Sequence, residues 1–374
     1  MMIDIIEVNS RKLLHDFIYL PSNIHANHEN WVPPIYMDEW DYFNPKKNDS
    51  FSHCDTILLL AFQGKRPIGR IMGIIHRSYN LKHNEKHARF AYLETENNPI
   101  IYNELMNSVK DWANSKGMTH LVGPLGFSDK DPQGFMIEGY NEPISIATNC
   151  NQPYMVDLTM NYGFQAKLDL VVYKIPVPET QPELITKIEE RFRNRKTDLK
   201  VVEFNSRRKV RHYIHPVLTL VNQTFTDIYG FIPFTSREMD EMANRYLYLI
   251  NPEFIKIIVN GKNDVIAFVL GMSDLSEGFR KSRGKLLPFG FIQLLMAGKK
   301  STQLNLLLGA IHPDYQGRGL DMLMGARLIE SARKNGKKVM DSHLELETNL
   351  KVRAEMERMG GKVYKRYRIF IKEL

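Results

Sequence analysis

The chain has little cysteine and no long hydrophobic run. Its 374 residues include two cysteines, Cys54 and Cys150, which are too few for a disulfide framework. The N-terminal stretch lacks the long apolar core of a signal peptide, and no apolar run approaches the roughly 20 residues that cross a bilayer. These absences argue against a disulfide-rich secreted domain and a membrane-spanning protein, and they predict a cytoplasmic location.

Several familiar chemical patterns are also missing. No spacing of His and Cys along the chain is typical of a metal site, and no Ser, His and Asp arrangement indicates a nucleophilic triad. We therefore expect no bound metal. Lys and Arg outnumber Asp and Glu by 50 to 43, for a net charge of +7, which favours an anionic ligand without choosing among nucleotides, phosphates and nucleic acid.

A repeated order of secondary structure is present instead. Hydrophobic residues make up 43% of the chain, and each half is predicted as strand, two helices, three strands, helix, strand, helix, strand. The clearest similarity between the halves is a helix closed by glycine and followed by an aromatic-apolar strand. It is seen in MNYGFQAKLDLVVYKI of the first half and MERMGGKVYKRYRIFIKE of the second. Pro176 and Pro178 favour an extended linker. We predict an α/β protein of two tandem domains, residues 1–175 and 176–374.

The second half contains the elements that matter for chemistry. They are a helix over Arg207–Ile228, a strand over Leu304–Ile311, a helix after Gly319, a strand over Val339–Leu346, a helix over Asn349–Met359 and a strand over Lys362–Ile371. The strand over Leu304–Ile311 is too apolar for one solvated face, so we expect it to be buried on both sides.

The turn Gln316-Gly317-Arg318-Gly319 lies between that strand and a helix. The first amides of a helix have no intrahelical acceptor and carry partial positive charge, so an anion is their natural ligand. Gly317 and Gly319 allow the backbone to curl close to such a ligand, and Arg318 can add a charge-assisted hydrogen bond. On glycine chemistry alone, a plain strand-to-helix turn is an equal alternative.

The longer string HPDYQGRGL, His312–Leu320, resembles the pyrophosphate loop of the GNAT superfamily of N-acetyltransferases. The family pattern is Gln or Arg, two residues, Gly, one residue, then Gly or Ala. The chain departs from it at Asp321, which puts a carboxylate near the expected phosphates. A second stretch, Asn349–Gly360, is similar to the family's helix that opens with Asn and ends in Gly, although Met356 stands where many members have tyrosine and Gly361 replaces an aromatic residue.

The resemblance implies a fold and a co-substrate. In the family each domain is a mixed, mostly antiparallel sheet flanked by helices, which splays between its fourth and fifth strands. The pantetheine arm of acetyl-CoA or another acyl-CoA lies in the gap, and loop amides bind the pyrophosphate. Carried over to this chain, the residues implied in acyl-CoA binding are Ala310, Ile311, His312, Gln316, Gly317, Arg318, Gly319, Leu320, Asp321 and Asn349.

Three further segments bear on the same site. The stretch Glu94–Ile100, after the fourth strand of the first half, has two carboxylates and no glycine, so we expect no CoA binding there in the family manner. Ser273–Gln303 is longer than the connection that it replaces and could form a lid, an acceptor pocket or a surface helix. Gly123–Tyr140, rich in glycine and acid, could close over an acceptor where the halves meet.

Acyl transfer from a thioester needs donors for the developing oxyanion and a general base for the amine proton. Four side chains alternate along and just beyond the strand over Val339–Leu346 and would share one face: Asp341, His343, Glu345 and Glu347. A polar face inside a sheet is costly unless it lines a wet gap. We predict Glu345 and His343 as catalytic bases, with Asp341 and Glu347 behind them; an edge strand with a solvated face is the alternative.

The acid that protonates the leaving thiolate is less defined. Met356 cannot donate a proton, so Tyr364 or Tyr367 could substitute, or the thiolate could leave unassisted. The predicted function is transfer of an acyl group to an amine of a small molecule or peptide, by a working C-terminal domain and a degenerate N-terminal one. Nucleic acid is not expected as a partner, and the oligomeric state is open. The alternatives are a non-catalytic acyl-CoA sensor and a Fem-type transferase that uses aminoacyl-tRNA, although the intact loop argues against the latter.

Overall fold

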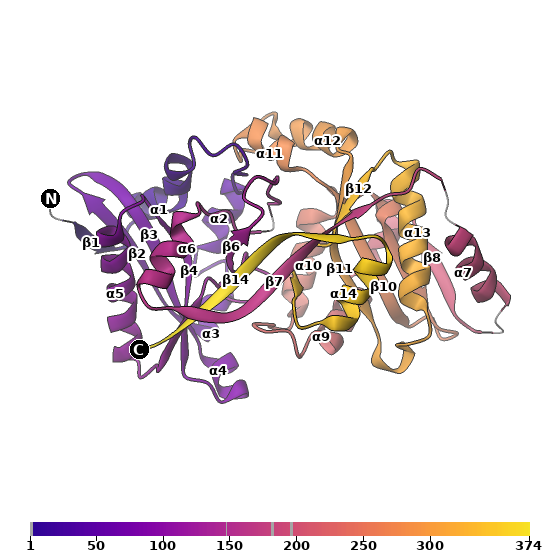
Figure 1. Ribbon diagram of the computed structural model, residues 1–374, viewed down its shortest axis with the longest axis horizontal. Coiled ribbons are helices and arrows are strands. Elements are labelled where there is room, and N and C mark those ends of the chain that lie inside the picture. The colour runs from indigo at the N-terminus through magenta and orange to yellow at the C-terminus, as the bar shows by residue number, and fades with distance from the viewer. Residues whose placement is uncertain (1–2, 147, 181–182, 195–196) are drawn as a thin grey trace.

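The computed structural model describes residues 3–146, 148–180, 183–194 and 197–374. The molecule is elongated, with the first half of the chain at one end and most of the second half at the other (Figure 1). The last strand of each half, Gln165–Pro176 and Lys362–Glu373, crosses the middle of the molecule, and the C-terminus lies beside the first half (Figure 1). No helix among the described residues is long and apolar enough to cross a membrane.

The first half follows the predicted order with short additions. Its elements are β1 (Asp4–Glu7), α1 (Arg11–Ile24), α2 (Tyr36–Tyr42), α3 (Ser50–His53), β2 (Cys54–Gln63), β3 (Arg66–His76), α4 (Arg77–His83), β4 (His87–Thr95), α5 (Pro99–Ser115), β5 (His120–Gly123), β6 (Phe135–Glu138), α6 (Tyr154–Asn161) and β7 (Gln165–Pro176). Gly117 and Gly163 follow α5 and α6 with φ of 74° and 98°, the left-handed geometry that ends a helix at glycine.

The second half repeats the order and inserts two helices before its fourth strand. Its elements are α7 (Glu183–Asn194), β8 (Lys200–Glu203), α8 (Arg207–Arg211), α9 (Ile214–Thr224), α10 (Ser236–Tyr246), η1 (Pro252–Phe254), β9 (Ile255–Val259), β10 (Val265–Ser273), α11 (Ser276–Ser282), α12 (Gly290–Lys300), β11 (Gln303–Ile311), η2 (Pro313–Tyr315), α13 (Leu320–Lys334), β12 (Val339–Asp341), β13 (Glu345–Leu346), α14 (Leu350–Arg358) and β14 (Lys362–Glu373).

The predicted single helix over Arg207–Ile228 is wrong, because the chain breaks between α8 and α9. Pro216 explains the break: it has no N–H and its ring clashes with the preceding helical turn, so it is tolerated only in the first turn of a helix. It lies in the first turn of α9, which begins at Ile214. By contrast, α10 begins cleanly with a capping box, in which reciprocal hydrogen bonds join Thr235 and Glu238.

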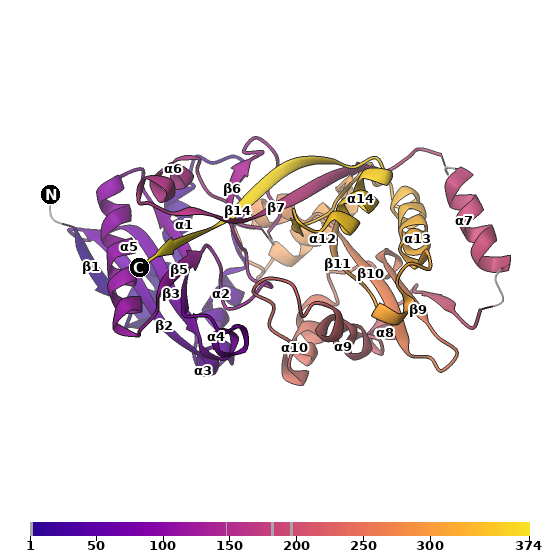
Figure 2. The ribbon, with the colours of Figure 1, turned by 60° about the horizontal axis from the view of Figure 1, so that its bottom comes forward.

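One continuous sheet joins the two halves, because each half lends its last strand to the other. The strand order is β1-β2-β3-β4-β5-β14-β7-β12-β11-β10-β9-β8. The last strand of the chain, β14, therefore extends the first-half sheet beside β5, whereas β7 extends the second-half sheet beside β12. The two exchanged strands pair with each other in the middle (Figures 1 and 2).

A cross-half ion pair fixes the register of the exchanged strands. Arg368 on β14 donates two hydrogen bonds of 2.7 Å to the Asp169 carboxylate on β7. This bidentate arrangement restricts how the two side chains, and so the two strands, can be placed relative to each other. The predicted linker is also tied down, since Val177 N–H donates to Lys338 O at 2.9 Å. The division into domains 1–175 and 176–374 stays a prediction, and the exchange means that neither half completes its sheet alone.

Helices cover both faces of the sheet in each half. In the first half, α5 buries Ile101, Leu105 and Val109 on one face, while α1 buries Phe17 and Ile18 on the other. In the second half, the buried side chains Leu218 and Val221 of α9 cover one face, and Leu320, Leu323 and Met324 of α13 cover the other. A further apolar cluster, which includes Val32, Ile144, Leu275, Phe279 and Leu294, takes residues from both halves, so the junction is packed like a domain interior.

Two segments singled out in the sequence meet at this junction. The segment carrying α11 and α12 contacts the first half, since Tyr36 N–H donates to Gly284 O at 3.2 Å. The glycine-rich Gly123–Tyr140 contacts the second half through Asp129 N–H, which donates to Gly230 O at 3.2 Å. Both segments therefore lie where the halves meet, and their contact with an acceptor stays a prediction.

Candidate active site

The second-half sheet splays between its fourth and fifth strands. The parallel ladder between β11 and β12 covers three residue pairs and ends where Asn305 lies beside Asp341. Beyond that point β11 continues along β10 to Ile311, whereas the chain after β12 turns away and continues along β7 as β13. The region between the outer part of β11 and β13, called the splay below, matches what the resemblance implied.

The part of β11 that borders the splay is apolar but incompletely covered. Leu304 and Asn305 are buried, whereas Leu306–Ile311 are partly or fully accessible. The expectation that Leu304–Ile311 is buried on both sides is therefore wrong beyond Asn305, because the neighbouring strand diverges there. Leu307 is the extra residue of a β-bulge, between the pairs Leu270↔Leu308 and Gly271↔Leu306. Such a bulge re-aims backbone groups next to a site.

Local contacts hold the chain as it leaves β11. Ala310 and Ile311 are the last residues paired with β10, and His312 N–H donates to Ile266 O at 2.8 Å. The His312 ring then accepts the Asp314 N–H at 3.3 Å and so caps η2. The predicted ligand loop therefore starts from a fixed strand end.

The glycine turn itself is held from inside and open on its outer side. Gln316 Nε2 donates to Ile311 O at 3.2 Å, and the Arg318 guanidinium lies over the Tyr315 ring with its carbon 4.7 Å from the ring centre. Gly317 and Gly319 have φ of 71° and 79°, and a Cβ on either would meet nothing within 4 Å. Glycine is thus required here by backbone conformation rather than by crowding.

The first turn of α13 presents amides without intrahelical acceptors. Leu323 N–H donates to Gly319 O at 3.2 Å, so the amides of Leu320, Asp321 and Met322 precede the hydrogen-bonded part of the helix. Their partial positive charge adds to the macrodipole of α13. The turn and this helix end together form the geometry that binds phosphate groups.

The predicted strand over Val339–Leu346 is wrong, because the chain breaks between β12 and β13. His343 has φ of 60°, which is uncommon for a residue with a Cβ, and its N–H donates to Asp341 Oδ1 at 2.8 Å. That side-chain acceptor replaces a strand partner and kinks the chain. The period of two is therefore lost, and the four polar side chains do not share one face.

Two of the four base candidates are engaged in other contacts. Asp341 is 3% exposed, accepts the Tyr364 hydroxyl and lies 3.6 Å from Lys365 Nζ. Glu347 forms an ion pair with Arg366. Burial is the main cause that raises the pKa of the Tyr364 hydroxyl, and the charge of the nearby Asp341 carboxylate is the second. This tyrosine is therefore a poor acid. These contacts argue against Asp341 and Glu347 as bases.

Glu345 lies in a cluster of carboxyl groups from three elements. Burial, with the Glu355 carboxylate as the next cause, raises the pKa of Glu345 on β13 to about 8. Burial also raises the pKa of Glu355 on α14 to about 7. The second cause is the carboxylate of Asp321 at the start of α13, which is hydrogen-bonded to the Glu355 carboxyl. Burial lowers the pKa of His343, so its ring is neutral near pH 7. Glu355 was not predicted as a site residue from the sequence. The signal that could have found it was the unexpected carboxylate of Asp321, which lies beside Glu355 in the fold.

The other implied residues have local roles. Asn349 Oδ1 accepts the Val352 N–H at 3.4 Å and caps α14, so its contact with CoA stays a prediction. Met356 packs among apolar side chains, and Tyr367 is fully buried, with burial raising its pKa. The tyrosines considered as acids are therefore not set up to donate a proton readily.

The Asp321→Ala variant should change stability and ligand affinity in opposite directions. Loss of a carboxylate from the first turn of α13 should lower the free energy of unfolding by about 0.3–1 kcal/mol. Removal of the same charge from beside the proposed phosphate site should tighten CoA binding by about 1 kcal/mol, or roughly five-fold, at low salt. Thermal unfolding and titration calorimetry with CoA measure the two effects. Equal or weaker affinity in Asp321→Ala and Glu355→Gln would show that these carboxyls do not face the ligand.

The matching turn of the first half offers fewer helix amides to a ligand. Asn98 Oδ1 accepts the Ile100 N–H at 2.9 Å, and Pro99 at the start of α5 has no N–H to offer. Glu96 forms an ion pair with Arg66. These contacts support the prediction that this half does not bind CoA through its α5 turn.

The fold is a tandem GNAT-like fold, and solved structures agree over the whole chain. No family model matches the chain. A tandem GNAT protein from the clavulanic acid biosynthesis pathway has a TM-score of 0.57 at 11% identity, with 100% of this chain and 98% of that chain covered. A GCN5-related N-acetyltransferase from Sphaerobacter thermophilus has a TM-score of 0.52 at 10% identity, with 99% and 95% covered. At such identities the likeness shows the fold alone.

Two curated proteins are similar in sequence over nearly their full lengths. The bacterial ceramide synthase of Caulobacter vibrioides (strain NA1000 / CB15N) is 26% identical over 380 residues, which cover 100% of this chain and 98% of the relative. Protein YghO of Escherichia coli (strain K12) is 24% identical, with 96% and 93% covered.

Proposed function

We propose that the protein is an acyl-CoA-dependent N-acyltransferase whose working site is the splay of its second half. The observation that carries the proposal is that β11 diverges from β12 and then leads directly into a turn and helix end with free amides. An apolar strand edge followed by an anion site matches the two chemical parts of CoA, a thin pantetheine arm and a pyrophosphate. Gln316, Gly317, Arg318, Gly319 and Leu320 would hold the pyrophosphate.

The reaction needs no covalent enzyme intermediate. The acceptor amine attacks the thioester carbonyl, and a β11 amide near the Leu307 bulge would donate to the oxygen as it becomes negative. Glu345 would take the proton that the nitrogen loses. The tetrahedral intermediate then expels the CoA thiolate and leaves an amide. His343, neutral near pH 7, is the alternative base.

The leaving group needs little help from the protein. A thiol has a pKa of about 8.5, so a CoA thiolate is stable enough to depart unprotonated and to collect its proton from water or from protonated Glu345. This accounts for a site with Met356 at the usual tyrosine position and with Tyr364 bonded to Asp341.

A lipid amine is the acceptor class that we propose. One relative is named a ceramide synthase, and a ceramide is the amide of a fatty acid with a long-chain amino alcohol. The surface of α12 and the chain before it supports a lipid substrate, because its large apolar side chains are exposed: Leu287 75%, Phe289 69%, Ile292 53% and Met296 52%. Acyl-CoA as donor also fits the cytoplasmic location predicted from the sequence.

Acyl transfer can be tested directly with the purified protein. Acetyl-CoA and palmitoyl-CoA would each be mixed with a long-chain amino alcohol in detergent or vesicles, with a short polyamine and with a peptide amine. We expect CoA release and amide product with the long-chain amine. Transfer only to the polyamine or peptide would keep the transferase and remove the lipid acceptor. Saturable CoA binding without release for any acceptor would favour an acyl-CoA sensor instead.

A further inference from the structure

Three side chains with metal-binding atoms converge on segments of the first half. His25 ends α1, His28 lies in the following turn, and Cys150 precedes α6. His25 Nδ1 lies 3.3 Å from His28 Nδ1, and Cys150 Sγ lies 3.4 Å from His28 Nδ1. The three atoms all lie within 4.8 Å of one another, so a single small cation could touch all of them.

Hydrogen bonds cannot satisfy all three atoms. A neutral imidazole nitrogen carries either one proton or one lone pair. If His28 Nδ1 donates its proton to His25, it cannot accept from the Cys150 thiol. If His28 Nδ1 accepts, its one lone pair can take a proton from His25 or from Cys150 but not from both. One short contact is therefore left without a hydrogen bond, whereas a cation would accept a lone pair from each atom.

The two separations that involve His28 match edges of a zinc tetrahedron. Zinc lies about 2.0–2.1 Å from imidazole nitrogen and about 2.3 Å from thiolate sulfur. Tetrahedral angles then place two nitrogens about 3.4 Å apart, and a nitrogen and a sulfur about 3.6 Å apart. The observed 3.3 Å and 3.4 Å are within a few tenths of an ångström of these edges.

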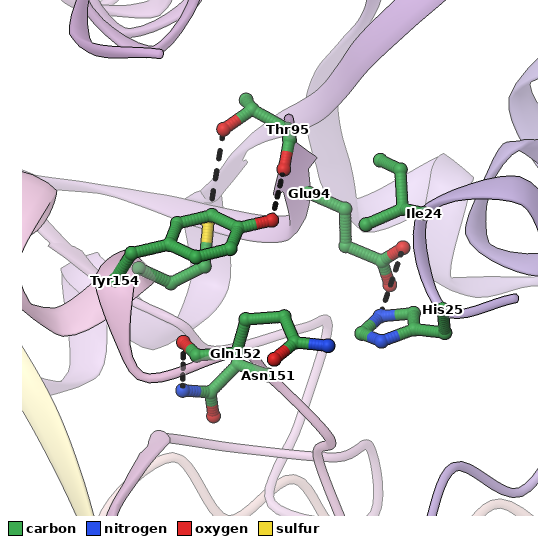
Figure 3. A pocket seen from close by; sticks show the side chains of 8 residues that line it. Ile24, His25, Glu94, Thr95, Asn151, Gln152 and Tyr154 are labelled. Atoms are coloured by element: carbon green, nitrogen blue, oxygen red, sulfur yellow. Dashed lines mark hydrogen bonds and ion pairs between the residues drawn. The ribbon is translucent and has the colours of Figure 1, made fainter. Parts of the chain in front are cut away.

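The surroundings orient the cluster. His25 is 3% exposed, and its Nε2 points toward the Glu94 carboxylate with Oε2 3.7 Å away (Figure 3). A histidine that ligates through one nitrogen usually directs the other toward a carboxylate or carbonyl. Trp31 stacks on the His25 ring with centres 5.4 Å apart. On the other side, the Asn151 carboxamide pairs with the backbone of Met136, which fixes the loop that carries Cys150.

We propose that His25, His28 and Cys150 bind one Zn²⁺ ion, with Glu94 as the positioning residue for His25. The thiolate and imidazole donors select zinc over calcium or magnesium, which prefer oxygen. Binding replaces the Cys150 S–H bond with a sulfur–zinc bond and releases that proton to solvent. Three protein ligands leave a fourth position open for water or a ligand, as in catalytic zinc sites. The sequence did not indicate this site because Cys150 and His28 are 122 residues apart.

The two cysteines of the chain provide the test and its control. The metal-free full-length protein would be titrated with Co²⁺, which reports tetrahedral ligation by visible bands and thiolate ligation by a near-ultraviolet charge-transfer band. We expect both features in the wild type, their loss on adding Zn²⁺, and loss of the charge-transfer band in Cys150→Ser. Cys54→Ser, which changes a buried cysteine outside the cluster, should keep both. Absence of the bands in the wild type, or their survival in Cys150→Ser, would overturn the proposal.

A second variant tests the positioning role of Glu94. Glu94→Gln should retain the cobalt spectrum and weaken Zn²⁺ affinity by about 10–100-fold, as losses of outer carboxylate partners do. Circular dichroism of the metal-free variants identifies any that fail to fold. Unchanged Zn²⁺ affinity in a folded Glu94→Gln would remove Glu94 from the site. Metal content is read without acyl transfer, so the outcome is independent of the proposed function.

Discussion

Gly319→Glu should abolish the stabilisation of this protein by acyl-CoA. A ligand at about 100 times its dissociation constant adds roughly 2.7 kcal/mol to the free energy of unfolding, which raises the melting temperature of a domain of this size by several degrees. Gly319 opens α13 at φ of 79° with nothing beside it. A carboxylate there would repel the pyrophosphate and, with its Cβ, strain the turn. Thermal unfolding with and without palmitoyl-CoA measures the loss.

Gly336 provides the matched control at the opposite end of the same helix. It follows α13 with φ of 68°, and a Cβ there would also meet nothing within 4 Å. Gly336→Glu therefore adds the same charge and similar backbone strain away from the proposed ligand. It should melt earlier than the wild type but keep the full shift with palmitoyl-CoA. If Gly319→Glu also keeps the full shift, CoA does not bind at this turn.

Glu345→Gln should lower turnover by about 10²–10⁴-fold, the usual contribution of a positioned general base. The change keeps the size of the side chain and removes the proton acceptor. Because burial raises the pKa of Glu345 to about 8, wild-type kcat/KM should rise about ten-fold per pH unit up to about pH 8 and then level off. The variant should lose this dependence while its affinity for acyl-CoA changes little. Glu347→Gln, which alters the carboxylate paired with Arg366, should retain it.

Glu345→Gln should also remove a loss of folding stability that the wild type suffers as the pH rises. An unfolded glutamate has a pKa of about 4.3, so between that value and pH 8 the folded protein holds a proton on Glu345 that the unfolded chain has lost. Wild-type stability from this group therefore falls as pH rises through this range. Glu345→Gln cannot ionise, so its melting temperature should exceed that of the wild type by a margin that grows up to about pH 8. Parallel pH profiles of the two melting temperatures would contradict the burial of Glu345.

Local patterns predicted the fold well where their causes are local. The glycine that closes α6, the strand that follows it and the glycine turn that opens α13 each depend on residues within a few positions. The errors also have physical reasons. Pro216 divided one predicted helix, and the contact between Asp341 and His343 N–H divided one predicted strand. In both places a single side chain overrode a periodic pattern.

The candidate site was predicted in part. The turn over Gln316–Gly319 follows from sequence because glycine conformation and helix-end amides are properties of adjacent residues. The protonation of Glu345 is different, since it depends on burial and on Glu355 from another element. The resemblance implied a splay, and only the strand pairing shows that it starts after Asn305 and Asp341.

The sequence by itself determined the order of strands and helices that the two halves share, apart from one divided helix and one divided strand, and it determined the position of the donor-rich turn. These features follow from backbone hydrogen bonding and side-chain periodicity, which act over a few residues. Tertiary structure alone decided which strands are neighbours, including the exchange of β7 and β14 held by Arg368 and Asp169, 199 residues apart. It also decided which polar groups meet, such as Glu345 with Glu355 and His28 with Cys150. These contacts depend on packing between segments that are distant in sequence. The number of residues between two segments does not determine how close they lie in the folded protein.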